Sequence, residues 1–126
     1  MDASKLGRIL KAMEEQDMPQ MIISDPASIF YLTGKWIHPG ERLLARYLNV
    51  NGNHKLVINE LFPQEKDLGI ELFWYNDIDD AVEMMMEFIQ KSRPSGIDKV
   101  WTARFLVRLQ ELGGGSKFLK GSMMVD

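Results

Sequence analysis

The first 20 residues show the spacing of an amphipathic helix. Apolar side chains recur there every three or four positions: Leu6, Ile9, Leu10 and Met13. This spacing predicts a helix, because residues three and four apart share one helical face. Ser4 is placed to cap the helix at its start, and Pro19 is placed to end it.

A buried strand and a second helix are predicted next. Residues 21–23 form a short apolar run between two prolines, which favours a strand. Asp25 suits the N-cap position of the following helix. Pro26 suits its first position, where no N–H donor is needed. Gly34 can adopt the left-handed conformation that commonly ends a helix.

The middle of the chain predicts a hairpin followed by another strand. Residues 43–50 and 54–59 are apolar runs, and they flank an Asn-Gly pair at positions 51–52. Such a pair is a strong hairpin signal, because both residues accept positive φ. We expect a short helix from Pro63 to Gly69, and a third long strand over residues 70–75.

Asp77 is the predicted cap of the next helix. The apolar face expected for this helix has the following members: Ile78, Val82, Met85 and Ile89, with Ala81 and Phe88 beside it. Residues 92–96 contain proline and glycine, so they end the helix. Residues 97–100 read as a short strand.

The last elements complete an alternating pattern of helices and strands. Thr102 is a suitable cap for a helix whose apolar positions are Leu106, Leu109 and Leu112. Glycines 113–115 end that helix, and residues 117–120 read as an edge strand. The order predicts a three-layer α/β/α sandwich with a mixed sheet of five or six strands, because the hairpin must be antiparallel and later crossovers favour parallel pairing.

Composition excludes several classes of protein. The chain has 126 residues, the size of one domain, and carries a net charge of −3, which argues against a nucleic-acid-binding surface. It has no cysteine, so disulfides, thiolate zinc sites and a thiol nucleophile are excluded. This suits a cytoplasmic location. No apolar run has the roughly 18 residues that a membrane span requires.

No segment of the chain forms a complete catalytic motif. His38 and His54 lack a second histidine at the spacing of a helical zinc site, so both are expected at the surface. Asp77, Asp79 and Asp80 cluster where they can complement a helix dipole without a metal. The GGGSK run at 113–117 follows a helix instead of a strand, so it reads as a loop and not a phosphate site. We expect no catalytic residue and no metal ligand in this chain.

One loop has the composition of a contact surface. Residues 35–42 contain Trp36, His38 and Arg42, and both tryptophan and arginine are enriched where binding energy is concentrated. Arg42 can present a fork of donors to a carboxylate. The alternatives are packing of Trp36 across the sheet edge, and a surface ion pair of Arg42 with Glu41 or Glu71.

Residues 23–34, ISDPASIFYLTG, and residues 39–43, PGERL, resemble the N-terminal domain of the creatinase, prolidase and aminopeptidase P family. A hairpin after the arginine and a GIDK strand at 96–99 agree with this resemblance. It covers nearly the whole chain and is nearest to the Xaa-Pro dipeptidase branch. It implies a creatinase/prolidase N-terminal domain, with a ribonuclease H-like motif, over residues 1–121.

The family resemblance implies the function expected for the chain. Family members carry a second, catalytic domain with a pair of divalent metal ions, usually manganese, cobalt or zinc. The N-terminal domain contributes to the homodimer and to the cleft that receives a proline-containing peptide. By this resemblance Trp36, His38 and Arg42 are cleft candidates, and Arg42 is the candidate contact to a substrate carboxylate. We expect the isolated domain to be inactive.

Residues 122–126 resemble the start of the family's linker helix, so we expect a catalytic domain to follow in cis; a frayed tail is the alternative. Two other functions stay open. The chain could be a free-standing α/β module that binds a ligand or partner, since one fold hosts many functions. It could also be the N-terminal domain of a creatinase-type amidinohydrolase.

Overall fold

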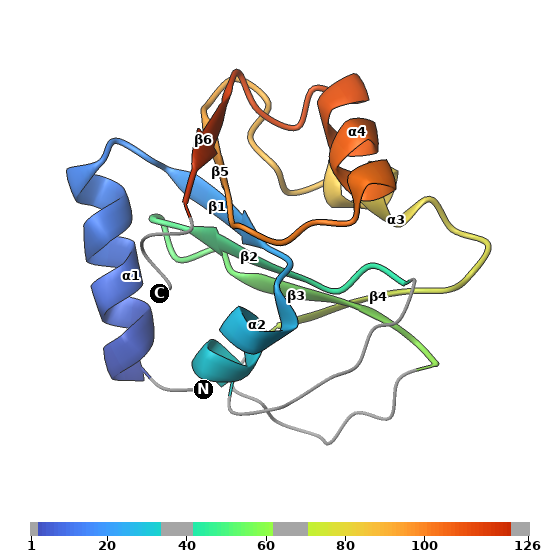
Figure 1. Ribbon diagram of the computed structural model, residues 1–126, viewed down its shortest axis with the longest axis horizontal. Helices are drawn as coiled ribbons and strands as arrows, with labels where there is room; N and C mark the ends of the chain where they lie inside the picture. Colours follow the sequence, from blue (N-terminus) through green and yellow to red (C-terminus); the bar gives the residue numbers. More distant parts are fainter. Residues whose placement is uncertain (1–2, 34–41, 62–70, 122–126) are drawn as a thin grey trace.

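The computed structural model describes residues 3–33, 42–61 and 71–121 (Figure 1). These residues form four helices and six strands, in the following order along the chain: α1 (Ala3–Glu15), β1 (Gln20–Ile23), α2 (Pro26–Thr33), β2 (Ala45–Asn49), β3 (Lys55–Asn59), β4 (Leu72–Tyr75), α3 (Ala81–Met85), β5 (Ser95–Ile97), α4 (Ala103–Glu111) and β6 (Phe118–Lys120). None of the described helices has the length and apolar character needed to span a bilayer.

The six strands form one mixed sheet in the order β4-β3-β2-β1-β5-β6. β2 pairs antiparallel with both β1 and β3, whereas the other neighbours pair in parallel. Five strands therefore run in one direction and β2 runs against them. β4 extends the sheet on one side of the β2–β3 hairpin, and β1, β5 and β6 extend it on the other. This is the mixed sheet that the sequence predicted.

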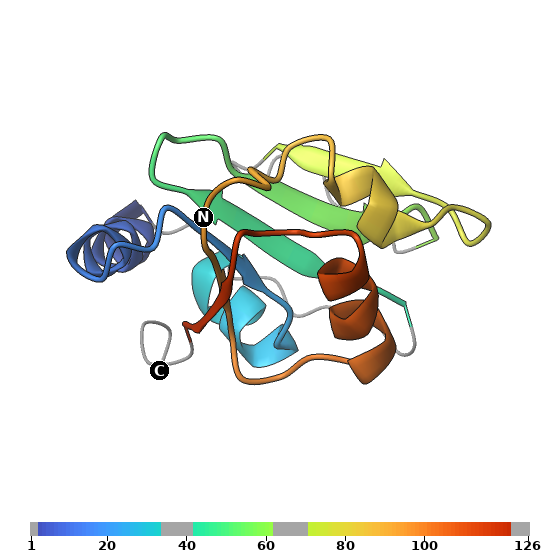
Figure 2. The same cartoon turned by 90° about the horizontal axis from the view of Figure 1, so that it is seen from above.

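Alternating side chains of the strands divide the core into two layers. Met21 and Ile23 of β1 pack with Ile9 and Met13 of α1 on one face. Ile22, between them in sequence, packs on the other face with residues of α3 and α4. The period of two along a strand produces this division, because successive side chains point to opposite faces. Figure 2 shows α1 at one end of the sheet and α3 and α4 toward the other.

Several local predictions are confirmed. The helix predicted near the N-terminus is α1, and the Asp25 carboxylate accepts hydrogen bonds from the backbone N–H of Ala27 and the hydroxyl of Ser28 at the start of α2. The hairpin joins β2 and β3, with Gly52 at a φ of 94°. Its connection is longer than the two-residue turn that the Asn-Gly pair suggests.

The predicted cap of the third helix is wrong. Asp80 caps α3 by accepting from the N–H of Glu83, and Ile78 is 93% exposed and not on the buried face. α3 also ends early, at Met85, and the chain continues in tighter turns. Val82, Met85 and Ile89 are nevertheless buried, as the apolar pattern predicts.

Two other boundaries differ from the prediction. Ser4 lies inside α1 and not before it, and β5 begins at Ser95, two residues earlier than expected. Gly96 fits within β5 because Met18 packs against its backbone; a Cβ there would lie 2.1 Å from the Met18 sulfur. Thr102 occupies the N-cap of α4 but makes no side-chain cap hydrogen bond.

Some predictions lie outside the described residues. They are the end of the second helix at Gly34, the short helix from Pro63 to Gly69, and the linker helix over 122–126. Trp36 and His38 also lie outside them, whereas Arg42 is described.

Candidate functional site

The candidate site lies at the sheet edge where the parallel strands end, which we call the carboxyl edge. β1, β3, β4 and β5 all end there, and β2 starts there because it runs in the opposite direction. Arg42 lies three residues before the start of β2, and so it lies at this edge. Ligands of open α/β sheets bind outside the carboxyl ends of the strands, near the point where the strand order diverges.

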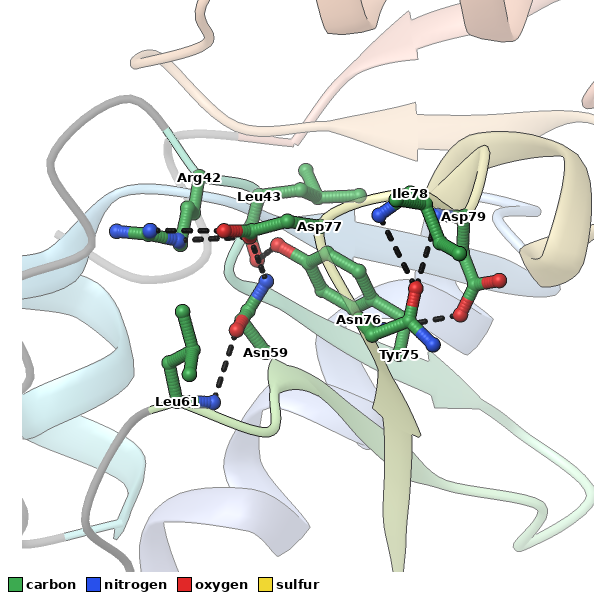
Figure 3. A network of polar contacts seen from close by, with 9 residues as sticks. All are labelled: Arg42, Leu43, Asn59, Leu61, Tyr75, Asn76, Asp77, Ile78 and Asp79. Carbon is green, nitrogen blue, oxygen red and sulfur yellow. Dashed lines mark hydrogen bonds and ion pairs between the residues drawn. The ribbon is translucent and has the colours of Figure 1, made fainter.

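Arg42 is held at the carboxyl edge by a two-pronged contact with Asp77 (Figure 3). Its Nε donates to Asp77 Oδ1 at 2.9 Å, and its Nη2 donates to Oδ2 at 2.9 Å. Both side chains are about half exposed, at 42% and 49%. This parallel arrangement fixes the guanidinium plane more strictly than a single contact would.

Asp77 is itself oriented by a buried asparagine at the end of β3. Asn59 Nδ2 donates to Asp77 Oδ1 at 2.7 Å, and Asn59 Oδ1 accepts from the backbone N–H of Leu61 at 2.9 Å. Asn59 is fully buried. The hydrogen bonds from Arg42 and then from Asn59 hold the pKa of Asp77 below its ordinary value. Asp77 is therefore an anion whose position is fixed by Arg42, which precedes β2, and by Asn59, which ends β3.

The backbone beside Arg42 is fixed as well. The Tyr75 hydroxyl, at the end of β4, donates to the carbonyl of Leu43 at 2.6 Å. Burial raises the pKa of this hydroxyl, so it stays protonated and keeps donating at neutral pH. The end of β4 thus holds both the main chain next to Arg42 and, through Asp77, the guanidinium.

The segment after β4 is a tight polar turn. Asn76 Oδ1 accepts from the N–H groups of Ile78 and Asp79, and the Asn76 N–H donates to Asp79 Oδ2 at 2.9 Å. These bonds satisfy the backbone locally without a helix. Asp77 pairs with Arg42, whereas the carboxylate of Asp79 accepts a hydrogen bond within the turn.

A cleft of about 330 Å³ opens beside this network. Its lining includes Arg42, Tyr75 and Asp77, together with Phe105 and Arg108 of α4. Arg108 pairs with Asp80 at 2.7 Å, so a second arginine–aspartate pair lines the same cleft. A smaller hollow of about 190 Å³ shares Arg42 and Phe105 with the cleft. Arg42 therefore lies where the two hollows meet.

Asp98 is a buried acidic residue that sequence reasoning did not select. Its two oxygens accept from the backbone N–H groups of Ser24 and Asp25, each at 2.9 Å, and so join the ends of β1 and β5. Burial raises the pKa of this carboxyl. Both oxygens serve backbone donors, so its role is structural.

The remaining candidates do not gather at a site. His54 Nδ1 accepts from the backbone N–H of Asn49 in the hairpin, at the opposite edge of the sheet. In the GGGSK run, the carbonyl of Gly114 accepts a hydrogen bond from the hydroxyl of Ser95. Among the residues that the structure describes, no three acidic or histidine side chains come together in a way that would hold a metal.

Arg42 pairs with Asp77, which was not among the partners that the sequence suggested. The candidates were Glu41, outside the described residues, and Glu71, which pairs instead with Lys55. Asp77 was assigned to helix capping because it precedes an apolar helix pattern. Its sequence distance from Arg42 is 35 residues, so no local signal could connect the two.

Comparison with known proteins identifies the family. The chain matches the Creatinase/Prolidase N-terminal domain over residues 5–126. No curated protein matches it in a sequence search.

Solved structures show the same fold. A proline dipeptidase structure from Streptococcus pneumoniae superposes with a TM-score of 0.80 at 17% identity, covering 96% of this chain and 93% of that one. A dipeptidase from Mycobacterium ulcerans has a TM-score of 0.77 at 22% identity, over 93% of this chain and 33% of that one. One from Pyrococcus horikoshii gives 0.74 at 20%, over 92% and 33%. By its match along nearly all of its length, the chain belongs to the Creatinase/Prolidase N-terminal domain family.

Proposed function

We propose that this chain is the non-catalytic N-terminal domain of an Xaa-Pro dipeptidase, and that its carboxyl edge forms part of the substrate cleft. The family match and the dipeptidase names of the similar structures support the reaction class. The chain spans only a third of the Mycobacterium ulcerans and Pyrococcus horikoshii dipeptidases, which leaves room there for a separate catalytic domain.

The observation that carries the cleft role is the fixed guanidinium of Arg42 beside a cleft of about 330 Å³. A guanidinium recognises a carboxylate through paired hydrogen bonds, and a dipeptide substrate has a terminal carboxylate. In this proposal Arg42 contacts that carboxylate. Trp36 and His38, in the loop before Arg42, supply further wall of the cleft.

Peptide hydrolysis by such an enzyme needs groups that the described part of this chain does not bring together. The described residues offer no cluster of carboxylates and histidines to hold a metal pair. We place the pair of divalent ions (manganese, cobalt or zinc) in a catalytic domain in cis, where it would supply an activated water. The contribution of this domain is to bind and orient the substrate and to support a homodimer. We also place the enzyme in the cytoplasm, since a chain without cysteine suits a reducing compartment.

An assay of the full-length gene product can distinguish two other functions from the proposed one. A creatinase-type enzyme would use the same domain beside a different catalytic centre, and a free-standing module would bind a ligand without hydrolysis. The full-length gene product should be assayed with Xaa-Pro dipeptides, with dipeptides lacking proline, and with creatine. We expect hydrolysis of the Xaa-Pro substrates alone.

Hydrolysis of creatine, or no hydrolysis of any substrate by a folded and metal-loaded protein, would refute the proposal. Light scattering on the same sample tests the homodimer. A monomer with full activity would remove dimerisation from the role of this domain.

A further inference from the structure

Asp77 and Asn59 control the direction in which the Arg42 guanidinium points. We propose that Asp77, oriented by Asn59, is a positioning residue that prepares Arg42 to receive the substrate carboxylate; this inference rests on the proposed cleft role of Arg42. Neither Asp77 nor Asn59 has to touch the substrate. Each acts through the next residue of a chain of hydrogen bonds that starts in the buried sheet and ends at the cleft.

In the first step, Asp77 fixes the orientation of the Arg42 guanidinium. Free arginine side chains sample many rotamers, and two parallel contacts of 2.9 Å select one guanidinium plane. The pair therefore defines the position and the plane of the binding group.

The second step anchors Asp77 to the rigid part of the fold. Asp77 lies in the turn after β4, where a side chain about half exposed could move easily. Asn59 removes that freedom by donating to Asp77 Oδ1 at 2.7 Å from a fully buried position. The backbone N–H of Leu61 in turn fixes the Asn59 amide. The ends of β3 and β4 thus set the guanidinium that precedes β2.

The third step concerns competing charges. Asp79 and Asp80 also line the cleft, and Asp80 already pairs with Arg108. Without the Asp77 carboxylate, these two neighbours would attract the Arg42 guanidinium out of its present orientation. Asp77 prevents this by pairing with Arg42 in place. The result is a binding group that is oriented before the substrate arrives, which reduces the cost of binding.

The test is a mutant cycle in the full-length enzyme with an Xaa-Pro dipeptide. We expect Asp77→Asn to lower kcat/KM by about 10- to 100-fold, mainly through KM, as expected when a binding group is misplaced. Arg42→Ala should lower it by at least as much. Adding Asp77→Asn to Arg42→Ala should cause no further loss, because Asp77 acts only through Arg42.

Two further variants make the cycle specific. Glu71→Gln removes another ion pair, between exposed Glu71 and the half-buried Lys55, at the opposite end of β4, and should change kcat/KM less than about twofold. Asp77→Glu restores the charge and should recover part of the loss; it also carries the comparison if Asp77→Asn lowers the folded fraction.

The outcomes separate this inference from the proposed function. If Arg42→Ala leaves kcat/KM unchanged, the cleft role of Arg42 itself is wrong. If Arg42→Ala lowers kcat/KM but Asp77→Asn does not, or if Asp77→Asn causes an additional loss in the Arg42→Ala background, the positioning role is wrong and the cleft role stands.

Discussion

Replacement of Gln20 by leucine tests the buried polar network that joins β1 to the segment after α3. Gln20 is fully buried. Its Oε1 accepts from the Tyr47 hydroxyl at 2.7 Å and from the Gln90 N–H at 2.9 Å. Its Nε2 donates to the carbonyls of Gln90 and Arg93 at 2.7 and 3.3 Å. Leucine has a similar size but makes none of these bonds.

The magnitude follows from the groups left without partners. The Tyr47 hydroxyl and the Gln90 N–H both lose their acceptor, and each unsatisfied buried donor costs about 1–3 kcal/mol. Water can reach the carbonyls of Gln90 and Arg93 more easily, because Gln90 is half-buried and Arg93 is exposed. Gln20→Leu should therefore lower the free energy of unfolding by about 2–6 kcal/mol. A chain of this length has about 6–19 kcal/mol in total.

Urea denaturation of the domain measures this change. The midpoint should fall while the slope stays constant, because the surface exposed on unfolding is nearly the same. Gln16→Leu, at an exposed position, is the matched control and should change stability by less than about 0.5 kcal/mol. Tyr47→Phe combined with Gln20→Leu should cost less than the sum of the two single changes. A Gln20→Leu protein within about 0.5 kcal/mol of the wild type would refute the reasoning.

Three further predictions concern stability. Burial, and then the charge of Arg46, lower the pKa of His54 below its ordinary value of 6.5. Below about pH 6.5 the unfolded chain therefore binds a proton more readily than the folded chain, so the free energy of unfolding should fall as the pH drops. The fall should be smaller in His54→Gln. Gly114→Ala would place a Cβ 2.3 Å from a Leu109 methyl and should cost about 1–3 kcal/mol by urea titration, whereas Gly7→Ala, in open space on α1, should stabilise by about 0.5–1 kcal/mol. Asp98→Ala leaves two backbone N–H groups without their acceptor and should cost about 2–6 kcal/mol in the same assay.

Local chemistry predicted much of the fold. The Asp25-Pro26 pair starts α2, and the apolar run before it is β1, because a cap and a short buried run are both encoded within a few residues. The Asn-Gly pair marked the hairpin correctly. Its longer connection was not predictable, since Gly52 is the one residue within it that takes positive φ, and the pairing of the two strands already ends at Tyr47 and Lys55.

Tertiary contacts explain the errors. Asp77, Asp79 and Asp80 are all competent caps, and the sequence cannot rank them. Arg42 and Asn59 withdraw Asp77 from capping, so Asp80 starts α3. In the same way Gln20, 70 residues away, binds the main chain at Gln90 and competes with continuation of the helix.

The candidate site was predictable only in part. The loop leading to Arg42 was selected from its composition, and the structure places Arg42 at the carboxyl edge beside a cleft. Its partners are Asp77, in the turn after β4, and Asn59, at the end of β3; they come close to Arg42 only in the folded sheet, so nothing within a short stretch of sequence identifies them.

The most direct test of the account compares an Xaa-Pro dipeptide with its C-terminal amide in the full-length enzyme, with and without Arg42→Ala. If Arg42 contacts the substrate carboxylate, Arg42→Ala should lower kcat/KM for the acid by about 10- to 150-fold, the worth of a hydrogen bond to a charged group. The amide lacks the charge, so the same variant should change its kcat/KM less than about twofold. Equal losses for acid and amide, or no loss for either, would contradict the assignment of Arg42 to the substrate cleft.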